Sequence, residues 1–297
     1  MRIHAIIIAL SLTIMSSALA EQTGEHRRII AGDYEKKRLA IVAPDGKVEW
    51  EEPIRDIHDL HVLSNGDILF QRSWTQILEM TPEHKVVWQY DAGRMNGNEG
   101  RRVEVHAFQR LPGGVTMIAE SGPGRIIEVD KDGKLLKEVK LHVAKNDTHR
   151  DTRLVRKLDN GHYLVAHEGE NVVREYDDTG KVVWEQSVGS RVYSATRLPN
   201  GNTLIGAGDG HRVIEVTPEH KEVWSLNEHD LPGVTLAWVT MVDRLPNGNT
   251  LVVNCHAGPA NPQIIEVTPD KKLVWSFKDF DHFGNALPVA RLMPTNH

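Results

Sequence analysis

The chain has 297 residues, of which 40% are hydrophobic and 26% are charged, so it can bury a sizeable core. Its formal net charge is −6 and it contains no densely basic run, which argues against nucleic acid as a partner. Cys255 is the only cysteine, so no intramolecular disulfide can form and the stability must come from packing.

The first twenty residues have the features of a secretory signal peptide. Arg2 precedes an apolar run from Ala5 to Met15, and Ala18-Leu19-Ala20 provides an A-x-A cleavage site. The run is too short to span a hydrocarbon layer of about 30 Å. We therefore expect residues 1–20 to be removed and residues 21–297 to form one secreted or periplasmic domain, with no membrane segment after cleavage.

A repeated pattern fills the rest of the chain. Its two clearest copies are TRLPNGNTLIGAGDGHRVIEVTPEHKEVW, which ends at Trp224, and DRLPNGNTLVVNCHAGPANPQIIEVTPDKKLVW, which ends at Trp275. Three looser copies end at Trp88, Lys137 and Trp184, and a sixth copy is split between residues 27–50 and 289–294. The copies repeat about every 45 residues, which is the size of a propeller blade.

Each copy predicts four strands. A turn such as Asn160-Gly161 or Asn200-Gly201 favours a hairpin between the first and second strands, because both residue types tolerate positive φ. Segments such as RIIEV and QIIEV alternate apolar and polar residues as a third strand does, and a second turn leads to a fourth strand that ends in VVW. Six copies without an amphipathic helix predict an all-β, six-bladed β-propeller, and pairing of the C-terminal strand with the N-terminal blade would close the ring.

Recurrent tryptophans end the fourth strand of five copies. They are Trp50, Trp88, Trp184, Trp224 and Trp275. A residue that recurs in nearly every repeat serves the repeat, so we expect these side chains to pack between blades. Lys137 takes the place of tryptophan in the third copy, and we expect that junction to be the loosest.

The pattern LPNGNTL, EVTP and VVW resembles the propeller repeats of bacterial arylsulfotransferases and, more distantly, the PQQ-like repeats of quinoproteins, over nearly the whole mature chain. The arylsulfotransferase resemblance implies an enzyme in which a channel histidine attacks a sulfate ester. The segment IHDLHVLSNGDIL resembles that family's His-His-Asp segment, with His58 and Asp59 retained and Ile57 in place of the first histidine. The chain lacks that family's amino-terminal β-domain and cysteine pair, and PQQ is not expected because quinoprotein dehydrogenases resemble eight-bladed rings.

The first strand of each blade lines the central channel of a propeller, so the positions eight residues before each turn glycine mark one mouth of that channel. They are His58, His106, Arg153, Tyr193, Thr240 and, in the closing strand, Leu287. Because the six do not share one residue type and five are polar, we interpret them as a site rather than as blade packing. The ends of the second strands should approach the same mouth; they carry Arg72, Trp74, Glu120, His167, Glu168, Asp209, His211, Asn254, Cys255 and His256, and nearby loops add His149, His229 and His282.

Histidines at this mouth could bind a metal, bind an anion or transfer protons near neutral pH. The catalytic candidates are His58, His106 and His167. The candidates for substrate binding are Arg72, Glu120, Arg153, Tyr193, Trp238, Thr240 and His256. Arg72 and Arg153 could instead pair with Glu120 or Glu168, and Cys255 fits a small buried residue better than a nucleophile.

The sequence therefore predicts an exported, monomeric propeller that binds a small polar, anionic or carbohydrate-like ligand, and it leaves open whether the protein is also an enzyme. One alternative is the arylsulfotransferase-like enzyme. A second is a lyase or hydrolase with a divalent metal held by some of His58, His106, His167 and His256. A third is a non-catalytic scaffold for a glycan or a protein. The chain contains no Rossmann fingerprint, P-loop, HExxH or GxSxG motif.

Overall fold

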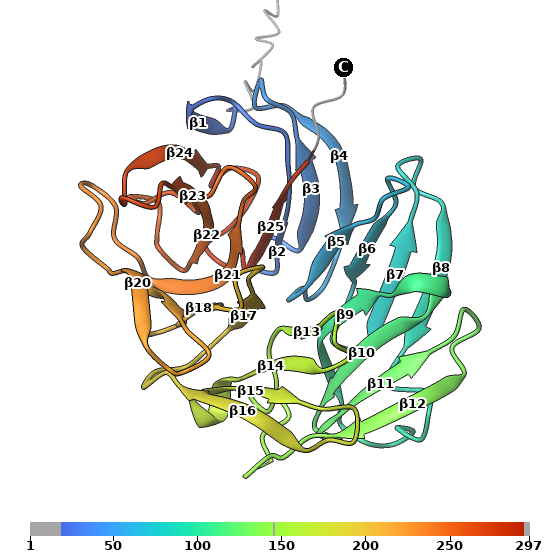
Figure 1. Ribbon diagram of the computed structural model, residues 1–297. Helices are drawn as coiled ribbons and strands as arrows, with labels where there is room; N and C mark the ends of the chain where they lie inside the picture. Colours follow the sequence, from blue (N-terminus) through green and yellow to red (C-terminus); the bar gives the residue numbers. More distant parts are fainter. Residues whose placement is uncertain (1–18, 145, 294–297) are drawn as a thin grey trace, which may run out of the picture.

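The structure is a computed structural model that describes residues 19–144 and 146–293. It confirms the predicted all-β six-bladed propeller, with six antiparallel sheets around a central channel (Figure 1). The signal-peptide prediction falls mainly on residues 1–18, outside the described residues. Within residues 19–144 and 146–293, no helix is long and apolar enough to cross a membrane.

Apart from one C-terminal strand in blade 1, the first three blades come from the first half of the chain. Blade 1 contains β25 (Val289–Leu292), β2 (Ile29–Asp33), β3 (Arg38–Val42) and β4 (Val48–Pro53). Blade 2 contains β5 (Leu60–Val62), β6 (Ile68–Gln71), β7 (Gln76–Met80) and β8 (Val86–Asp91). Blade 3 contains β9 (Glu104–Arg110), β10 (Thr116–Ser121), β11 (Arg125–Val129) and β12 (Leu135–Lys140), with the short 3-10 helix Pro112–Gly114 between β9 and β10.

The other three blades follow in chain order. Blade 4 contains β13 (Val155–Lys157), β14 (Tyr163–His167), β15 (Val172–Tyr176) and β16 (Val182–Ser187), with the 3-10 helix Glu168–Glu170 after β14. Blade 5 contains β17 (Ser194–Arg197), β18 (Thr203–Gly206), β19 (Val213–Val216) and β20 (Glu222–Leu226). Blade 6 contains β21 (Trp238–Arg244), β22 (Thr250–Cys255), β23 (Ile264–Val267) and β24 (Leu273–Lys278), and it gains β1 (Glu21–Gly24) as a fifth, outer strand.

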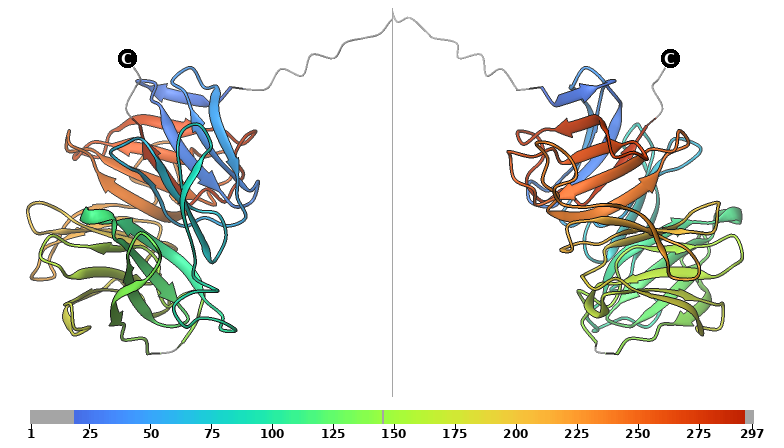
Figure 2. Two further views of the ribbon diagram at one scale, coloured as in Figure 1. Left: turned by 90° about the vertical axis from the view of Figure 1, so that its right-hand side faces the viewer. Right: turned by 60° about the vertical axis from the view of Figure 1, so that its left-hand side comes forward.

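Both ends of the described chain help to close the ring. As predicted, β25 pairs with β2, from Ile29 opposite Leu292 to Gly32 opposite Val289. Figures 1 and 2 show this red C-terminal strand beside the blue N-terminal blade. The pairing of β1 with β24 was not predicted from the sequence, and it fastens the N-terminal segment to blade 6.

Glutamate, tryptophan and arginine side chains at equivalent positions of the repeats make the same contact between neighbouring blades, which we call the blade clasp. Between blades 5 and 6, Nη2 of Arg244 lies 2.7 Å from Oε2 of Glu215, and the guanidinium lies over the ring of Trp224 at 5.1 Å. Nε1 of Trp224 donates to the carbonyl oxygen of Pro269 in blade 6 at 2.8 Å. Equivalent Glu-Trp-Arg sets are Glu79, Trp88 and Arg110; Glu175, Trp184 and Arg197; and Glu266, Trp275 and Arg27. For these four tryptophans, the predicted packing role is thus an aromatic cover over an ion pair, whereas the ring of Trp50 stacks on His84 of blade 2.

The junction between blades 3 and 4 has a different clasp, because Lys137 replaces the tryptophan. Tyr163 of blade 4 supplies the aromatic ring, with Nζ of Lys157 5.5 Å and Nζ of Lys137 5.8 Å from the ring centre. The Tyr163 hydroxyl and the Lys157 ammonium both donate to Oε1 of Glu128. This junction therefore retains the carboxylate and the cation of the other clasps.

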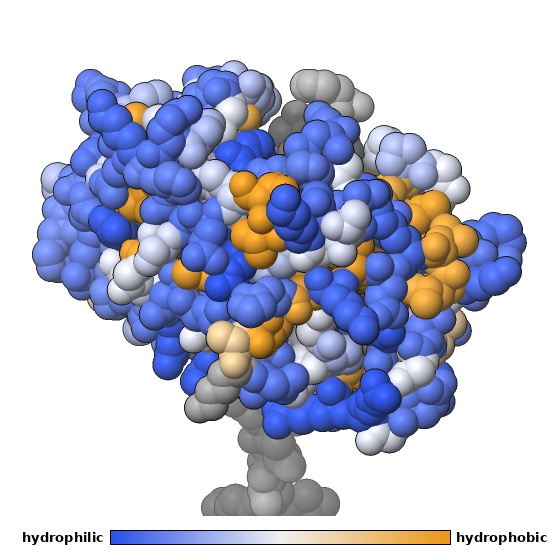
Figure 3. All heavy atoms as spheres, turned by 60° about the horizontal axis from the view of Figure 1, so that its bottom comes forward, coloured by the Kyte–Doolittle hydropathy of each residue, from blue (hydrophilic) through white to orange (hydrophobic). Residues whose placement is uncertain are grey.

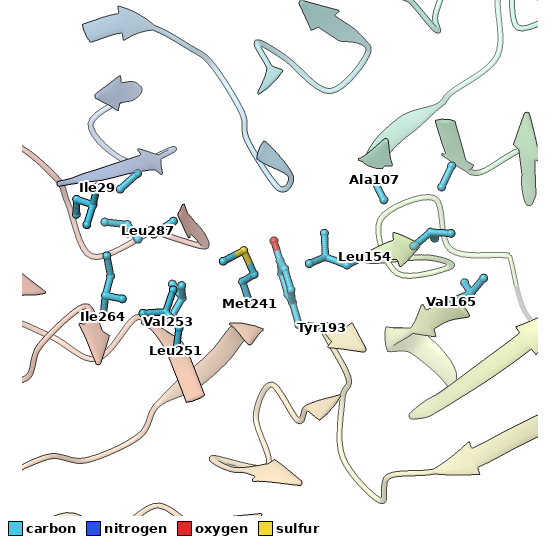
Figure 4. Packing of buried hydrophobic residues seen from close by; sticks show 14 of the residues in the cluster. Ile29, Ala107, Leu154, Val165, Tyr193, Met241, Leu251, Val253, Ile264 and Leu287 are labelled. Carbon is cyan, nitrogen blue, oxygen red and sulfur yellow. The ribbon is translucent and has the colours of Figure 1, made fainter. Parts of the chain in front are cut away.

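Contacts across the channel fill its interior. Arg156 of blade 4 binds both carboxylate oxygens of Asp59 of blade 2, at 2.7 and 2.8 Å. Figure 4 shows Tyr193, Met241 and Leu154 meeting near the axis. The interior of the channel is therefore packed, and access for a ligand lies at its ends.

The outer strands leave part of their apolar surface exposed. Valines and leucines at 37–54% exposure are Val86, Val87, Leu135, Leu136, Val183, Val223, Leu273 and Val274. On the face in Figure 3, apolar side chains form separate patches among hydrophilic residues.

Candidate functional site

A cavity of about 330 Å³ opens at one end of the channel. It is lined by residues at the starts of first strands, at the ends of second strands and in the adjoining loops, as the sequence predicts for a channel mouth. They are Tyr34, His58, Trp74, His149, Arg150, Arg153, Glu168, Arg191, Tyr193, Trp238, Thr240, Cys255, His256 and Pro288. Because the packed channel lies beneath it, the cavity is a cup rather than a pore.

Six of the ten candidate site residues line this cavity. They are His58, Arg153, Tyr193, Trp238, Thr240 and His256. A seventh, His106, is fully buried directly behind the wall, where Nη1 of Arg153 lies 3.2 Å from its Nε2. The structure thus brings most of the candidates together, including two of the three proposed as catalytic.

The other three candidates lie outside the cavity lining and are engaged elsewhere. Arg72 pairs with Glu52, and Glu120 accepts a hydrogen bond at 2.7 Å from Nε of Arg125. His167 is held at both ring nitrogens, 2.6 Å from the Asp151 carbonyl oxygen and 2.8 Å from the Tyr176 hydroxyl. These contacts give the three residues structural partners and no access to the cup.

His58 is one of three histidines that line the wall. Its Nδ1 lies 2.6 Å from the Tyr193 hydroxyl, and its ring stacks on Trp74 with centroids 5.0 Å apart. Burial, together with the nearby His106 and Arg153, holds the pKa of His58 well below its usual value, so the ring is neutral. Among the described residues, no group hydrogen-bonds to its Nε2, although the ring lines the cavity.

Behind His58, a carboxylate and two imidazoles form a compact cluster. Oε2 of Glu104 lies 2.8 Å from Nδ1 of His149 and 3.3 Å from Nε2 of His106. Burial, followed by the charge of Arg153, lowers the pKa of His106 to about 4. Burial works to raise the pKa of Glu104, but contacts with His106, His149 and Arg102 lower it below its usual value. A neutral imidazole and an ionised carboxylate therefore face each other at this wall.

The charged groups of the lining are mainly cationic. Arg153 pairs with the buried Glu168, as the sequence analysis allowed, and Arg150 lies 3.5 Å from the same carboxylate. Arg191 covers the ring of Trp238 at 5.8 Å and has only a loose contact of 3.6 Å with Asp209. Three arginines against one glutamate leave the cup electropositive.

Another part of the wall combines Tyr34 with His256, whose backbone conformation is strained. His256 has φ of +60°, the left-handed region that non-glycine residues seldom occupy, and its Nε2 lies 2.9 Å from the Tyr34 hydroxyl. Cys255 beside it is buried, and burial raises the pKa of its thiol, which fits the expectation of a small core residue.

Sequence reasoning missed Tyr34, Glu104, Arg150 and Arg191. Glu104 and Arg191 lie two residues before the candidates His106 and Tyr193, and residues two apart share a face of an extended chain. That spacing could have identified both. Tyr34 and Arg150 lie in turns between strands, where no comparable periodicity exists.

Comparison with known proteins identifies the repeats. A family model described as outer membrane protein assembly factor BamB, PQQ_2, matches residues 124–276, just over half of the chain. The chain belongs to this PQQ-like propeller family. The resemblance to PQQ-like repeats is thus confirmed, whereas the resemblance to arylsulfotransferases stays a prediction. No curated protein sequence matches this PQQ-like chain.

Solved structures share the fold of this PQQ-like propeller. A protein of unknown function from Bacteroides caccae has 24% identity and a TM-score of 0.79, with 91% of this chain and 99% of that chain covered. A streptogramin B lyase has 14% identity and a TM-score of 0.59, with coverage of 89% and 84%. A catalytically inactive virginiamycin B lyase from Staphylococcus aureus, solved with quinupristin, has 12% identity and a TM-score of 0.60, with coverage of 86% and 87%. At these identities the likeness concerns the fold alone.

Proposed function

We propose that this propeller binds, in the cup at its histidine-rich mouth, a small polar ligand that carries an anionic group and a flat aryl or sugar ring. The observation that carries the proposal is the lining itself, in which three arginines face one glutamate between aromatic side chains. The volume of about 330 Å³ is at the lower end of the range for small-molecule sites.

The charge of the cup favours an anion. Arg150 and Arg191 contact carboxylates only at 3.5 Å or more, so their guanidinium groups keep donors for a ligand. Guanidinium groups bind carboxylate, sulfate and phosphate oxygens through paired donors. His58 is neutral and would add one polar contact through Nε2.

The aromatic residues favour a ring. Trp74 and Trp238 lie on different blades and both line the cup, so a flat ligand between them could stack on one or both indoles. Arg191 lies over Trp238 and would place a cation beside that ring. A uronide or an aryl sulfate combines these features, and an aryl glycoside supplies the ring without the anion.

The test is a screen of sulfate esters, uronides and aryl glycosides against the mature protein by thermal shift, followed by calorimetric titration of each hit. Binding stabilises the folded state by an amount that grows with ligand concentration. Trp74→Ala and Trp238→Ala should each weaken a hit by about 10-fold or more, because stacking on an indole is lost. Trp224→Phe, in a blade clasp, should lower stability and leave affinity unchanged. Hits whose affinity is the same in Trp74→Ala and Trp238→Ala would refute the proposed site.

A second candidate function is catalysis, supported by the contact between Glu104 and His149. A carboxylate 2.8 Å from one imidazole nitrogen orients the ring and leaves Nε2 of His149 for proton transfer at the cavity. The arylsulfotransferase-like hypothesis would instead use Nε2 of His58 to attack the sulfur of a sulfate ester, with the aryl oxygen as the leaving group. If the protein turns over a hit and His149→Gln abolishes turnover but not binding, proton transfer by His149 is favoured. If only His58→Gln abolishes turnover, nucleophilic attack by His58 is favoured.

We also propose that the protein is exported, as its first twenty residues indicate and as the outer-membrane description of its family suggests. Cell fractionation and a mature N-terminus at Glu21 would support this. The same family description is also compatible with a non-catalytic scaffold that binds a glycan or a protein. The exposed valines of the outer strands would then form the binding surface. A partner that binds equally to wild type and to Trp74→Ala would favour the scaffold over the cup.

A further inference from the structure

We propose that Glu104, His106 and His149 bind one divalent transition-metal ion of the zinc class in the wall of the cup, with one coordination position open to the ligand. The proposal deepens the proposed function, because the ion would lie at the same cavity.

Three potential ligand atoms already converge. One potential ligand atom from each of Glu104, His106 and His149 lies within 4.8 Å of the other two. The two distances from the carboxylate oxygen, 2.8 and 3.3 Å, are close to the separation of about 3.3 Å that tetrahedral geometry imposes on ligands bound at about 2.0–2.1 Å. Small side-chain movements, with the proton of His149 shifted from Nδ1 to Nε2, would therefore complete the site.

The hydrogen bonding of His106 fixes the correct nitrogen as the ligand. Its Nδ1 lies 2.6 Å from the carbonyl oxygen of Thr152, and a carbonyl can only accept, so Nδ1 carries the proton. The lone pair of Nε2 then faces the carboxylate of Glu104 at 3.3 Å, and two acceptors at this distance require a cation or a proton between them. Histidines that bind metals characteristically donate their other N–H to a backbone carbonyl in this way.

In this structure the guanidinium of Arg153 acts as the cation near these two acceptors, since its Nη1 lies 3.2 Å from Nε2 of His106. A metal ion would take this lone pair, and Arg153 would have to release it. Arg153 keeps its ion pair with Glu168, which balances its charge. The released Nη1 would then stand beside the metal at the cavity, where both could hold one anionic group.

The ligand set indicates which ion. Two imidazoles and one carboxylate suit Zn²⁺ and its transition-metal neighbours, whereas Mg²⁺ and Ca²⁺ prefer oxygen ligands. Three protein ligands also leave a position free, as in sites where zinc binds water or a substrate. The side chain of His149 is 40% exposed and lines the cavity, which places the open side of the site toward the ligand.

This set differs from the histidine set that the sequence suggested. Nδ1 of His58 contacts Tyr193, His167 is held at both nitrogens, and Nε2 of His256 contacts Tyr34. Of that set, only His106 lies in the cluster with Glu104 and His149. Glu104 and His149 join it through the fold, since they come from β9 and from the loop before β13.

The experiment is a calorimetric titration of Zn²⁺ into the mature protein, purified through a tag without histidine and stripped with a chelator. We expect one Zn²⁺ per chain. His149→Gln and Glu104→Gln should each weaken binding at least about 100-fold, because even the loss of a residue that only orients a ligand costs about 10–100-fold. Co²⁺ should give a visible absorption spectrum that both variants lose.

His229→Gln is the matched control, because His229 is exposed and lies outside the cavity lining. Its affinity for Zn²⁺ should equal that of the wild type. No binding by the wild type, equal affinity in His149→Gln, or a preference for Mg²⁺ or Ca²⁺ would each overturn the proposal. His149 is partly exposed, so its variant should fold even if Glu104→Gln does not. The titration needs no organic ligand, so failure of this proposal is distinguishable from failure of the ligand-binding proposal.

Discussion

The blade clasp between Glu215 and Arg244 offers a quantitative test of how the repeat holds the ring together. The Glu215 side chain is 12% exposed and the Arg244 side chain 18%, so both charges are largely removed from water. Hydrogen bonds between charged groups of this kind contribute about 1.5–3 kcal/mol, and the cation over Trp224 adds about 0.5–1 kcal/mol.

Arg244→Met keeps the apolar stem over Trp224 and removes the guanidinium. Glu215 would then retain only its amide donors, with Nδ2 of Asn202 at 2.7 Å. We expect a loss of about 2–4 kcal/mol in the free energy of unfolding, because a mostly buried carboxylate loses its cation. Glu215→Gln should lose less, about 1–2 kcal/mol, since the glutamine oxygen still accepts from Asn202.

The assay is urea unfolding followed by circular dichroism, applied to both single variants and to the double variant. The coupling energy of this cycle should be about 1–2 kcal/mol, as for residues in direct contact. Lys272→Met, in an exposed pair with Asp270, should leave the midpoint unchanged. A coupling energy near zero, or an equal loss in Lys272→Met, would refute the clasp as a source of stability.

Three further predictions concern the ring and its pH dependence. Deletion of residues 21–25 removes β1, with the contacts of Gln22 with Trp275 and of Thr23 with Ser276. The free energy of unfolding, measured by heat or urea, should fall by about 2 kcal/mol. Unchanged stability would show that β1 does not stabilise blade 6. Tyr163→Phe removes one hydrogen bond to Glu128 and should cost about 1–2 kcal/mol, whereas a neutral result would mean that the junction of blades 3 and 4 does not depend on it. Burial lowers the pKa of His167 from 6.5 to about 4, so between these pH values the unfolded chain binds more protons than the folded protein. The free energy of unfolding should therefore be highest above pH 6.5 and fall toward pH 4, and about 3 kcal/mol of this loss should be absent in His167→Gln. An equal pH dependence in that variant would contradict the assignment.

Most of the fold was predictable because its signals are local and repeated. Asn-Gly turns, alternating third strands and the tryptophans at a spacing of about 45 residues specified six blades, and the split copy specified the closure by β25. The strand β1 was not predictable in this way. Its sequence, EQTG, has no apolar alternation, and its pairing depends on the distant Trp275 and Ser276.

The site was predictable in its position and only partly in its members. Counting back from the turn glycines identified His58, Arg153, Tyr193 and Thr240, which all line the cavity because first strands run in register around the channel. Arg72 and Glu120 lie outside the cavity lining because they pair with Glu52 and Arg125, and the sequence does not specify these partners. The contact of Glu104 with His149 depends on the conformation of the loop after blade 3 and needed the structure.

The central claim, that the cup is the ligand site, is tested most directly by a crystal structure of the mature protein with the tightest ligand from the screen. The account predicts ligand density between Trp74 and Trp238, with the anionic group within hydrogen-bonding distance of Arg150 or Arg191. Density at the outer strands or at the opposite end of the channel, with the cup filled only by water, would contradict it.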